Sequence, residues 1–208
     1  MATAVIIDDQ PYIRLMVGQI LQEEGIELLG ECADGVQGLA LIREAQPDIA
    51  VLELTLPNLE GLEVIERARR VSQATKWVVL TACPADYTLD RCLRAGITAF
   101  VPKAYDTQTF RHGIRAVKAG FTYYPDLACN KHQPGHGDED ERIRLSRLSA
   151  RELTVLRYLA VGFTNVQIGQ ALMLSNKTVS SYKTRLVNKL KVQTLVGLAE
   201  LARRHGLI

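Results

Sequence analysis

Short apolar runs alternate with amphipathic stretches over the first 120 residues of the chain. The runs AVIID, IAVLEL and WVVLT are almost continuously apolar, as expected for strands that helices cover on both faces. The stretches between them repeat apolar residues at helical spacing. This alternation predicts an α/β fold built on a doubly wound, five-stranded parallel sheet. The predicted strands are 4–8, 27–32, 49–54, 77–81 and 99–101, and the predicted helices are 11–24, 36–45, 62–71, 85–95 and 107–119.

The periodicity stops after Gly120 and returns in a purely helical form near Ser149. Ser149 and Glu152 have the spacing of a capping box, and Thr164, Ser175 and Thr194 are suitable caps for three further helices. The second and third of these four helices meet at a tight junction, which is typical of a helix-turn-helix. The sequence therefore predicts three parts: an α/β domain at 1–122, a linker at 123–145 and a small all-α, four-helix domain at 146–208.

The distribution of charge divides the chain at the same place as the pattern of apolar and polar residues. Residues 146–208 contain ten Lys or Arg against two Glu, a formal charge of +8, whereas the remainder has 15 basic and 21 acidic residues, a charge of −6. The overall charge is only +2. This division favours a basic module that binds a polyanion over charge scattered on a solvated surface.

The four cysteines show no paired spacing, so they predict neither a disulfide framework nor a zinc site; they are Cys32, Cys83, Cys92 and Cys129. Cys129 with His132 and His136 could ligate a metal, but a polar tether supplies such residues readily. The first strand follows Met1 directly, and no apolar run is long enough to cross a bilayer. We expect a soluble, cytoplasmic protein with no membrane partner.

Polar residues gather at the carboxyl ends of the predicted strands. Asp8 and Asp9 end the first strand, Glu53 the third and Thr81 the fourth, while Lys103 follows the fifth. Ligands of doubly wound sheets bind at this edge. The alternative, in which each residue only caps a helix or ends a strand, does not explain why all of them fall at one edge.

Carboxylates held close together repel one another and favour a hard cation such as Mg²⁺. The predicted metal ligands are the side chains of Asp9 and Glu53, Asp8 through water, and the Thr55 carbonyl. A phosphoryl group beside the ion would pair with the Lys103 ammonium group and accept a hydrogen bond from the Thr81 hydroxyl. A carboxylate in line with the phosphorus would be the nucleophile.

The third helix of the basic domain has two distinct faces. Apolar residues recur at helical spacing and are predicted to face the core: Val179, Tyr182, Leu186 and Leu190. The opposite face carries Lys177, Ser180, Ser181, Thr184, Arg185 and Asn188. Such a face suits the major groove of DNA, with Lys177, Lys183, Arg185 and Lys189 available for phosphates. The alternative is a basic helix that is only solvated. If the helix binds DNA, its Ser and Thr side chains can bond to several different bases and discriminate weakly among them. DNA shape and dimer spacing are therefore expected to contribute to specificity.

These motifs resemble those of a known family. The order DD, E-L-T-L-P-x-x-x-G, T-A and K resembles the flavodoxin-like receiver domain of bacterial two-component response regulators, and L-S-x-R-E-x-x-V-L with S-N-K-T-V-S-S-Y-K-T-R-L resembles a LuxR-type DNA-binding domain. Together they identify the chain as similar to the NarL/FixJ family, especially to virulence regulators of the Bvg and Evg type.

The resemblance implies roles for particular residues and partners. Asp8 and Asp9 match the metal-binding acids, Thr81 the switch hydroxyl, Phe100 the switch aromatic and Lys103 the phosphate-contacting lysine. It also implies Mg²⁺, promoter DNA, a sensor histidine kinase, and a homodimer to which the final helix contributes. Burial of that helix within its own domain would explain its apolar residues equally well. Pro102 precedes Lys103, whereas a proline often follows this lysine in the family.

Glu53 departs from the family at the phosphoacceptor position, where an aspartate is expected. A carboxylate that is one methylene longer misaligns in-line attack, and a misplacement of about 1 Å can cost about a hundredfold in rate. Glu53 either extends its negative charge towards Lys103 and Thr81 and imitates the phosphorylated state, or it abolishes switching. A glutamate introduced into an ordinary regulator would give the same pattern.

The sequence therefore predicts a DNA-binding transcriptional response regulator whose phosphorylation is impaired or mimicked. The alternative is a phosphorylation-independent protein-interaction module in which DNA binding is secondary. An enzyme that hydrolyses phosphate is disfavoured, because no general base beyond the acids at the sheet edge is present and the basic helices would have no task.

Overall fold

The computed structural model of the chain describes residues 1–83, 85–125, 139–205 and 207–208. The chain divides into two compact units, Met1–Leu127 and Ala128–Ile208. Cys129, His132 and His136 lie outside the described residues. In the described ranges, every helix is too short or too polar to span a bilayer.

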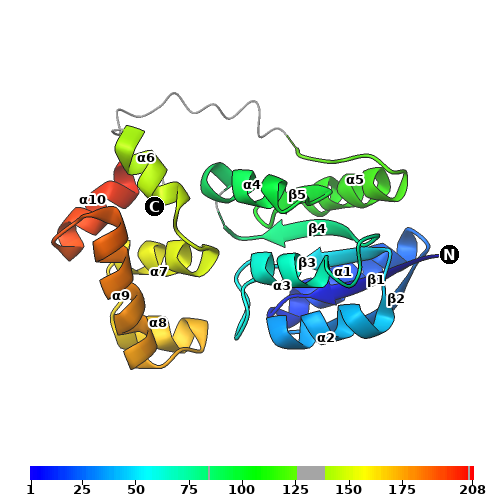
Figure 1. Cartoon of the computed structure of the whole chain (residues 1–208), viewed down its shortest axis with the longest axis horizontal. Coiled ribbons are helices and arrows are strands. Elements are labelled where there is room, and N and C mark those ends of the chain that lie inside the picture. The colour runs from blue at the N-terminus through cyan, green and yellow to red at the C-terminus, as the bar shows by residue number, and fades with distance from the viewer. Residues whose placement is uncertain (84, 126–138, 206) are drawn as a thin grey trace. The chain divides into compact units, whose positions relative to one another are not determined.

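The first unit is built on one parallel sheet, which confirms the predicted α/β fold (Figure 1). Its strands are β1 (Ala2–Ile7), β2 (Ile26–Cys32), β3 (Ile49–Leu52), β4 (Lys76–Thr81) and β5 (Ala99–Pro102). They pair in the order β2-β1-β3-β4-β5. The strand order reverses beside β1, because the chain moves outward to β2 and then returns to β3. A crevice is therefore expected at the carboxyl ends of β1 and β3.

Helices cover both faces of this sheet because alternate strand residues point to opposite sides. They are α1 (Pro11–Glu23), α2 (Gly35–Ala45), α3 (Gly61–Ala68), α4 (Ala85–Arg94) and α5 (Thr107–Lys118). On one face, Val17 of α1 and Ile114 of α5 share a fully buried core with Ile6 of β1. On the other face, α2 packs so closely on β1 that a Cβ at Gly38 would meet the Ile7 side chain.

Strand β3 ends two residues earlier than the sequence predicts. The Glu53 amide still donates to the Ile7 carbonyl of β1 (2.9 Å), but beyond it one carboxylate oxygen of Glu53 accepts hydrogen bonds from the amides of Leu54 (2.6 Å) and Thr55 (3.0 Å). A side chain that bonds to its own following backbone competes with strand pairing and turns the chain. The other strands differ from the prediction by one or two residues at an end.

The second unit is all-helical and contains the predicted helix-turn-helix. Its helices are α6 (Glu139–Ser146), α7 (Ala150–Ala160), α8 (Asn165–Leu172), α9 (Asn176–Leu190) and α10 (Leu195–Arg204). Ser149 and Glu152 form the predicted capping box, and Ser175 caps α9. Between α8 and α9, Met173 adopts a left-handed φ of 53°, and a Cβ at Gly169 would overlap the Leu174 carbonyl oxygen. A glycine at 169 therefore allows the tight turn.

Helix α6 is a difference from the prediction, since all of it except Ser146 falls in the segment 123–145 that the sequence assigned to a linker. Leu145 and Leu148, at and just beyond its end, are buried, and Glu141 pairs with Arg204 and with the ring of His205. One buried leucine within a short helix and another just beyond it are too few to establish a period. The contacts that hold α6 come from α9 and α10, which follow it by many residues.

Gly61, at the start of α3, tests how closely this helix packs against the end of β3 in the first unit. Its amide donates to the Leu54 carbonyl (2.9 Å), and a Cβ at Gly61 would overlap the Glu53 carbonyl oxygen and lie 2.8 Å from the Leu54 Cα. We expect Gly61→Ala to lower the free energy of unfolding by about 1–3 kcal/mol, because backbone must move. Urea unfolding followed by Trp77 fluorescence measures this unit alone, since Trp77 is the single tryptophan and is buried.

Gly18→Ala is the matched control within the same unit. A Cβ at Gly18 would make ordinary contacts at 3.6 and 3.8 Å, and the residue lies inside α1. This change should raise the stability by about 0.5–1 kcal/mol, because alanine is the better helix former. Equal losses in the two variants would contradict the specific role of Gly61.

Candidate acidic site and nucleic-acid interface

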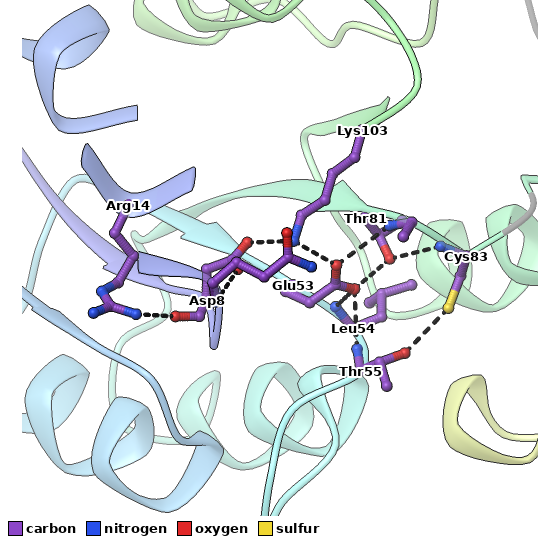
Figure 2. Close-up of polar contacts among 10 residues, drawn as sticks. Asp8, Arg14, Glu53, Leu54, Thr55, Thr81, Cys83 and Lys103 are labelled. Carbon is purple, nitrogen blue, oxygen red and sulfur yellow. Dashed lines mark hydrogen bonds and ion pairs between the residues drawn. The ribbon is translucent and has the colours of Figure 1, made fainter. Parts of the chain in front are cut away.

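The structure brings together four of the predicted residues at the carboxyl edge of the sheet: Asp8, Glu53, Thr81 and Lys103 (Figure 2). They follow or end β1, β3, β4 and β5. Asp8, Glu53 and Thr81 are at most 3% exposed, and the Lys103 side chain is 9% exposed. Charges buried to this extent must be compensated by partners within the protein.

Glu53 is the centre of the cluster. Its Oε1 accepts hydrogen bonds from the amides of Leu54 and Thr55 and from the Thr81 hydroxyl. Its Oε2 accepts one from the Ala82 amide (3.2 Å) and lies 2.9 Å from Lys103 Nζ. Both oxygens are therefore held by donors from three separate segments of the chain. This carboxylate is therefore fixed in position.

Lys103 bridges the two buried carboxylates, as Figure 2 shows. Its Nζ lies 2.7 Å from Asp8 Oδ2 as well as 2.9 Å from Glu53 Oε2. Burial alone would lower the pKa of Lys103, but the neighbouring charges, chiefly that of Glu53, raise it above its usual value. Lys103 is therefore charged at neutral pH and offsets one of the two negative charges.

Asp8 is the more weakly supported acid. Burial raises its pKa from 3.8 to about 6, although the hydrogen bond and charge of Lys103 act in the opposite direction. Asp8 Oδ1 accepts from the Gln10 amide (2.9 Å), while the Asp8 carbonyl accepts from Arg14 (2.8 Å). At pH 7 the side chain is ionised and paired.

The predicted Mg²⁺ ligands do not all come together. Asp9 is exposed, and among the residues that the structure describes no three His, Cys, Asp or Glu side chains are grouped to hold a metal. The Lys103 ammonium group lies between Asp8 and Glu53, and protein donors occupy both oxygens of Glu53. Lys103 thus occupies the space between the carboxylates that the ion would need, and the magnesium site at Asp8, Asp9, Glu53 and Thr55 stays a prediction.

Two features of the site had little or no sequence signal, the amides that bind Glu53 and the contact of Cys83. The amides of Leu54, Thr55 and Ala82 bind Glu53, but every residue except proline carries an amide, so residue type does not reveal such donors. Cys83, which the sequence linked to no function, is buried with its Sγ 3.2 Å from the Thr55 hydroxyl. Phe100, the predicted switch aromatic, is fully buried in β5.

Helix α9 presents most of the predicted DNA-binding residues on its exposed face. The exposed members are Lys177, Ser180, Ser181, Thr184, Arg185 and Lys189, whereas Lys183 is half-buried. Val179, Leu186 and Leu190 are fully buried on the other side, as predicted. Tyr182 was predicted to face the core but is only half-buried, with the Arg185 guanidinium 5.6 Å from the centre of its ring. A cation over an aromatic ring accounts for this intermediate position.

Two shallow hollows follow this face of α9. One is lined in part by Lys177, Ser181 and Arg185, and the other also includes Asn165 of α8 and Asn176. The two asparagines were missed, although Asn176 shares a helical face with Ser180 and Thr184. Lys189 Nζ lies 2.7 Å from Glu152 Oε2, so this predicted phosphate contact already has an intramolecular partner.

Comparison with known families matches nearly the whole chain. Residues 4–115 match the model of the response regulator receiver domain, and residues 146–202 match that of bacterial regulatory proteins of the luxR family. The chain is 40% identical over 203 residues to the virulence-factor transcription regulator BvgA of Bordetella pertussis, covering 98% of this chain and 97% of BvgA. It is 31% identical over 202 residues to the DNA-binding transcriptional activator EvgA of Escherichia coli K12, covering 97% and 98% of the two chains.

A solved structure shows the same fold. RcsB from Salmonella enterica serovar Typhimurium, bound to promoter P1flhDC in the presence of phosphomimetic BeF3⁻, superposes with a TM-score of 0.59. The match covers 98% of each chain at 23% sequence identity. At this identity the likeness shows the arrangement of elements and nothing finer.

The raised pKa of Asp8 gives a prediction with a definite sign. Between pH 3.8 and about 6 the folded chain keeps a proton that the unfolded chain has lost. The free energy of unfolding therefore falls as pH rises through this window, by roughly 3 kcal/mol from this group. Asp8→Asn should lack the fall. We expect the difference between the unmodified chain and Asp8→Asn to change over pH 4–7, measured by urea unfolding with Trp77 fluorescence in EDTA.

Other carboxyl groups titrate in the same range, so only the difference between the two proteins tests Asp8. Glu24, for example, has a pKa lowered to about 2 by Arg115 and Arg111, which makes its own contribution rise as pH increases towards neutrality. Parallel pH profiles for the two proteins would contradict the assignment.

Proposed function

Because the chain belongs to the NarL/FixJ family of two-component response regulators, with a receiver domain and a LuxR-type helix-turn-helix, we propose that Glu53 supplies a fixed negative charge in place of a transferable phosphoryl group. The chain is a DNA-binding transcriptional regulator of a two-component system. One observation carries the proposal: the Glu53 carboxylate contacts the Thr81 hydroxyl, the Ala82 amide and Lys103.

These three groups are the donors that a phosphoryl group at this edge would need. An ammonium group, a hydroxyl and a backbone amide together neutralise and orient an anion that projects beyond the end of β3. The extra methylene of glutamate extends the carboxylate in that direction. Thr81 and the loop that follows it are thus held by a permanent anion. The receiver would then remain in one state without a phosphoryl donor.

The same contacts oppose phosphorylation of Glu53. A nucleophilic oxygen must have a free lone pair in line with the phosphorus, and the two oxygens of Glu53 together accept five contacts. Receiver domains generally bind Mg²⁺ for phosphorylation. In this chain we expect Mg²⁺ binding to be weakened, because Lys103 already neutralises Asp8 and Glu53.

The proposed partners follow from the second unit and the family. Promoter DNA would contact the exposed face of α9, with base edges at Ser180, Ser181 and Thr184, and phosphates at Lys177, Lys183 and Arg185. Lys189 would contribute less, since it is paired with Glu152. We also propose a homodimer and a sensor histidine kinase whose phosphoryl group this receiver accepts poorly.

Replacing Glu53 tests the fixed-anion proposal. In the absence of a phosphoryl donor, we expect the unmodified chain to bind a duplex that it selects from a random pool about tenfold more tightly than Glu53→Gln, because the glutamine keeps the shape and removes the charge. Glu53→Asp should bind weakly until acetyl phosphate and Mg²⁺ are added. Electrophoretic mobility shift and sedimentation measure DNA affinity and dimerisation.

Intact mass spectrometry supplies the accompanying control. Acetyl phosphate with Mg²⁺ should add one phosphoryl group to Glu53→Asp and none to the unmodified chain. If unphosphorylated Glu53→Asp or Glu53→Gln binds DNA as tightly as the unmodified chain, Glu53 does not act as the activating anion. If the unmodified chain itself gains a phosphoryl group at Glu53, the charge is not fixed.

The salt dependence of DNA affinity tests the proposed DNA interface. Replacing Lys183 and Arg185 together by alanine should remove about two phosphate contacts and reduce the slope of log affinity against log salt by ~2, because fewer counterions are released. Fluorescence anisotropy of a labelled duplex at several NaCl concentrations measures the slope.

Arg147→Ala with Arg203→Ala is the matched control, since both residues are exposed, belong to the same unit and lie outside α9. This pair removes the same charge and should leave the slope nearly unchanged. An affinity that does not depend on salt, or an equal effect of both pairs, would rule out α9 as the DNA-binding face.

A further inference from the structure

A pocket lined largely by charged side chains lies in the receiver unit, apart from the acidic site. It has a volume of about 370 Å³ and lies between α3 and α4, with most of its residues near the carboxyl ends of these helices. It is lined by Leu62, Glu66, Arg69, Arg91, Arg94 and Ala95. None of these residues belongs to the cluster around Glu53. The volume falls at the lower end of the range for small-molecule sites, roughly 300–1,000 Å³.

The side chains that line this pocket carry a net positive charge. Three guanidinium groups face one carboxylate, and within the described part of the chain neither Arg94 nor Glu66 makes an ion pair. Basic residues at the end of a helix are partly stabilised by the helix dipole, which is equivalent to about half a negative charge. Arg91 and Arg94 lie in the last turn of α4. The lining of the pocket therefore keeps a net positive charge, which suits an anionic ligand.

Arg69 is held in place over the end of α4. One of its terminal nitrogens donates to the Ala95 carbonyl oxygen. Gly96 next to it has a φ of 75°, and a Cβ at Gly96 would overlap the Arg69 guanidinium. The glycine thus serves both the backbone turn and the space that Arg69 occupies. A guanidinium fixed in this way loses less entropy when it binds a ligand than a freely rotating one.

We propose that this pocket binds a small phosphorylated metabolite, with the phosphate against Arg69, Arg91 and Arg94. Guanidinium groups bind phosphate oxygens through paired hydrogen bonds, which suits a dianion on a short scaffold. Glu66 can accept hydrogen bonds from hydroxyl groups, and Leu62 and Ala95 provide an apolar wall. A sugar phosphate combines these features. The proposal does not involve Glu53 and stands or falls separately from the function proposed above.

Site-resolved NMR of the full-length chain tests the proposal, because phosphate also binds basic helices elsewhere. Ribose 5-phosphate is titrated in EDTA at constant ionic strength, with ribose and inorganic phosphate as separate probes. We expect saturable shifts of the Leu62, Glu66, Ala95 and Gly96 amides with ribose 5-phosphate, at least tenfold weaker binding of inorganic phosphate, and no shifts with ribose. Absence of shifts at these amides with millimolar ribose 5-phosphate would overturn the proposal. Equal affinity of the two phosphates would remove the role of the sugar.

Variants separate the pocket from general electrostatics. Arg91→Gln with Arg94→Gln should weaken ribose 5-phosphate binding at least tenfold. The matched control is Arg43→Gln with Arg70→Gln, two exposed arginines of the same unit that do not line the pocket, and it should bind as the unmodified chain does. Arg69→Lys keeps the charge and removes the planar fork, so it should also weaken binding tenfold and serves if the double variant fails to fold. Equal losses in the control pair would refute a built site.

Discussion

The burial of two carboxylates beside one ammonium group is the constraint on which the receiver unit depends. Asp8 and Glu53 are nearly inaccessible, and Lys103 compensates only one of their charges. An uncompensated charge in the interior costs several kcal/mol, so the remainder must be held by oriented dipoles. The amides of Leu54, Thr55 and Ala82 fulfil this role for Glu53. For Asp8, burial raises the pKa although Lys103 acts in the opposite direction.

This constraint explains the local architecture around the site. The parallel sheet brings the ends of β1, β3, β4 and β5 to one edge, where backbone amides are no longer used by strand pairing. Gly61 lets the β3–α3 connection close against the Glu53 backbone. The early end of β3 is a consequence of the same carboxylate, which binds the amides that would otherwise continue the ladder. A charged side chain therefore sets both the chemistry of the edge and the path of the chain.

The second unit has a different physical basis. Its apolar core is closed by short capped helices, and several of its basic residues lie on the exposed face of α9, where solvent and DNA phosphates can compensate them. In the receiver unit, three arginines between α3 and α4 bring like charges together around one pocket. The chain thus has an acidic edge whose charges are compensated within the protein, and two basic surfaces, on α9 and between α3 and α4, that can bind an external anion.

The sequence by itself determined the elements whose causes are local: the apolar runs of the strands, the Ser149–Glu152 capping box, the tight turn before Ser175, and the polar residues at the strand ends. It also identified Glu53 as the departure from the family. Only the tertiary structure decided that Lys103 bridges Asp8 and Glu53, that backbone amides hold Glu53, that α6 is stabilised by α9 and α10, and that Arg69, Arg91 and Arg94 line one pocket. The physical reason is distance along the chain. Hydrogen bonds and caps within a few residues leave a pattern in the sequence, whereas ion pairs and amide contacts between segments far apart depend on how the sheet and helices pack.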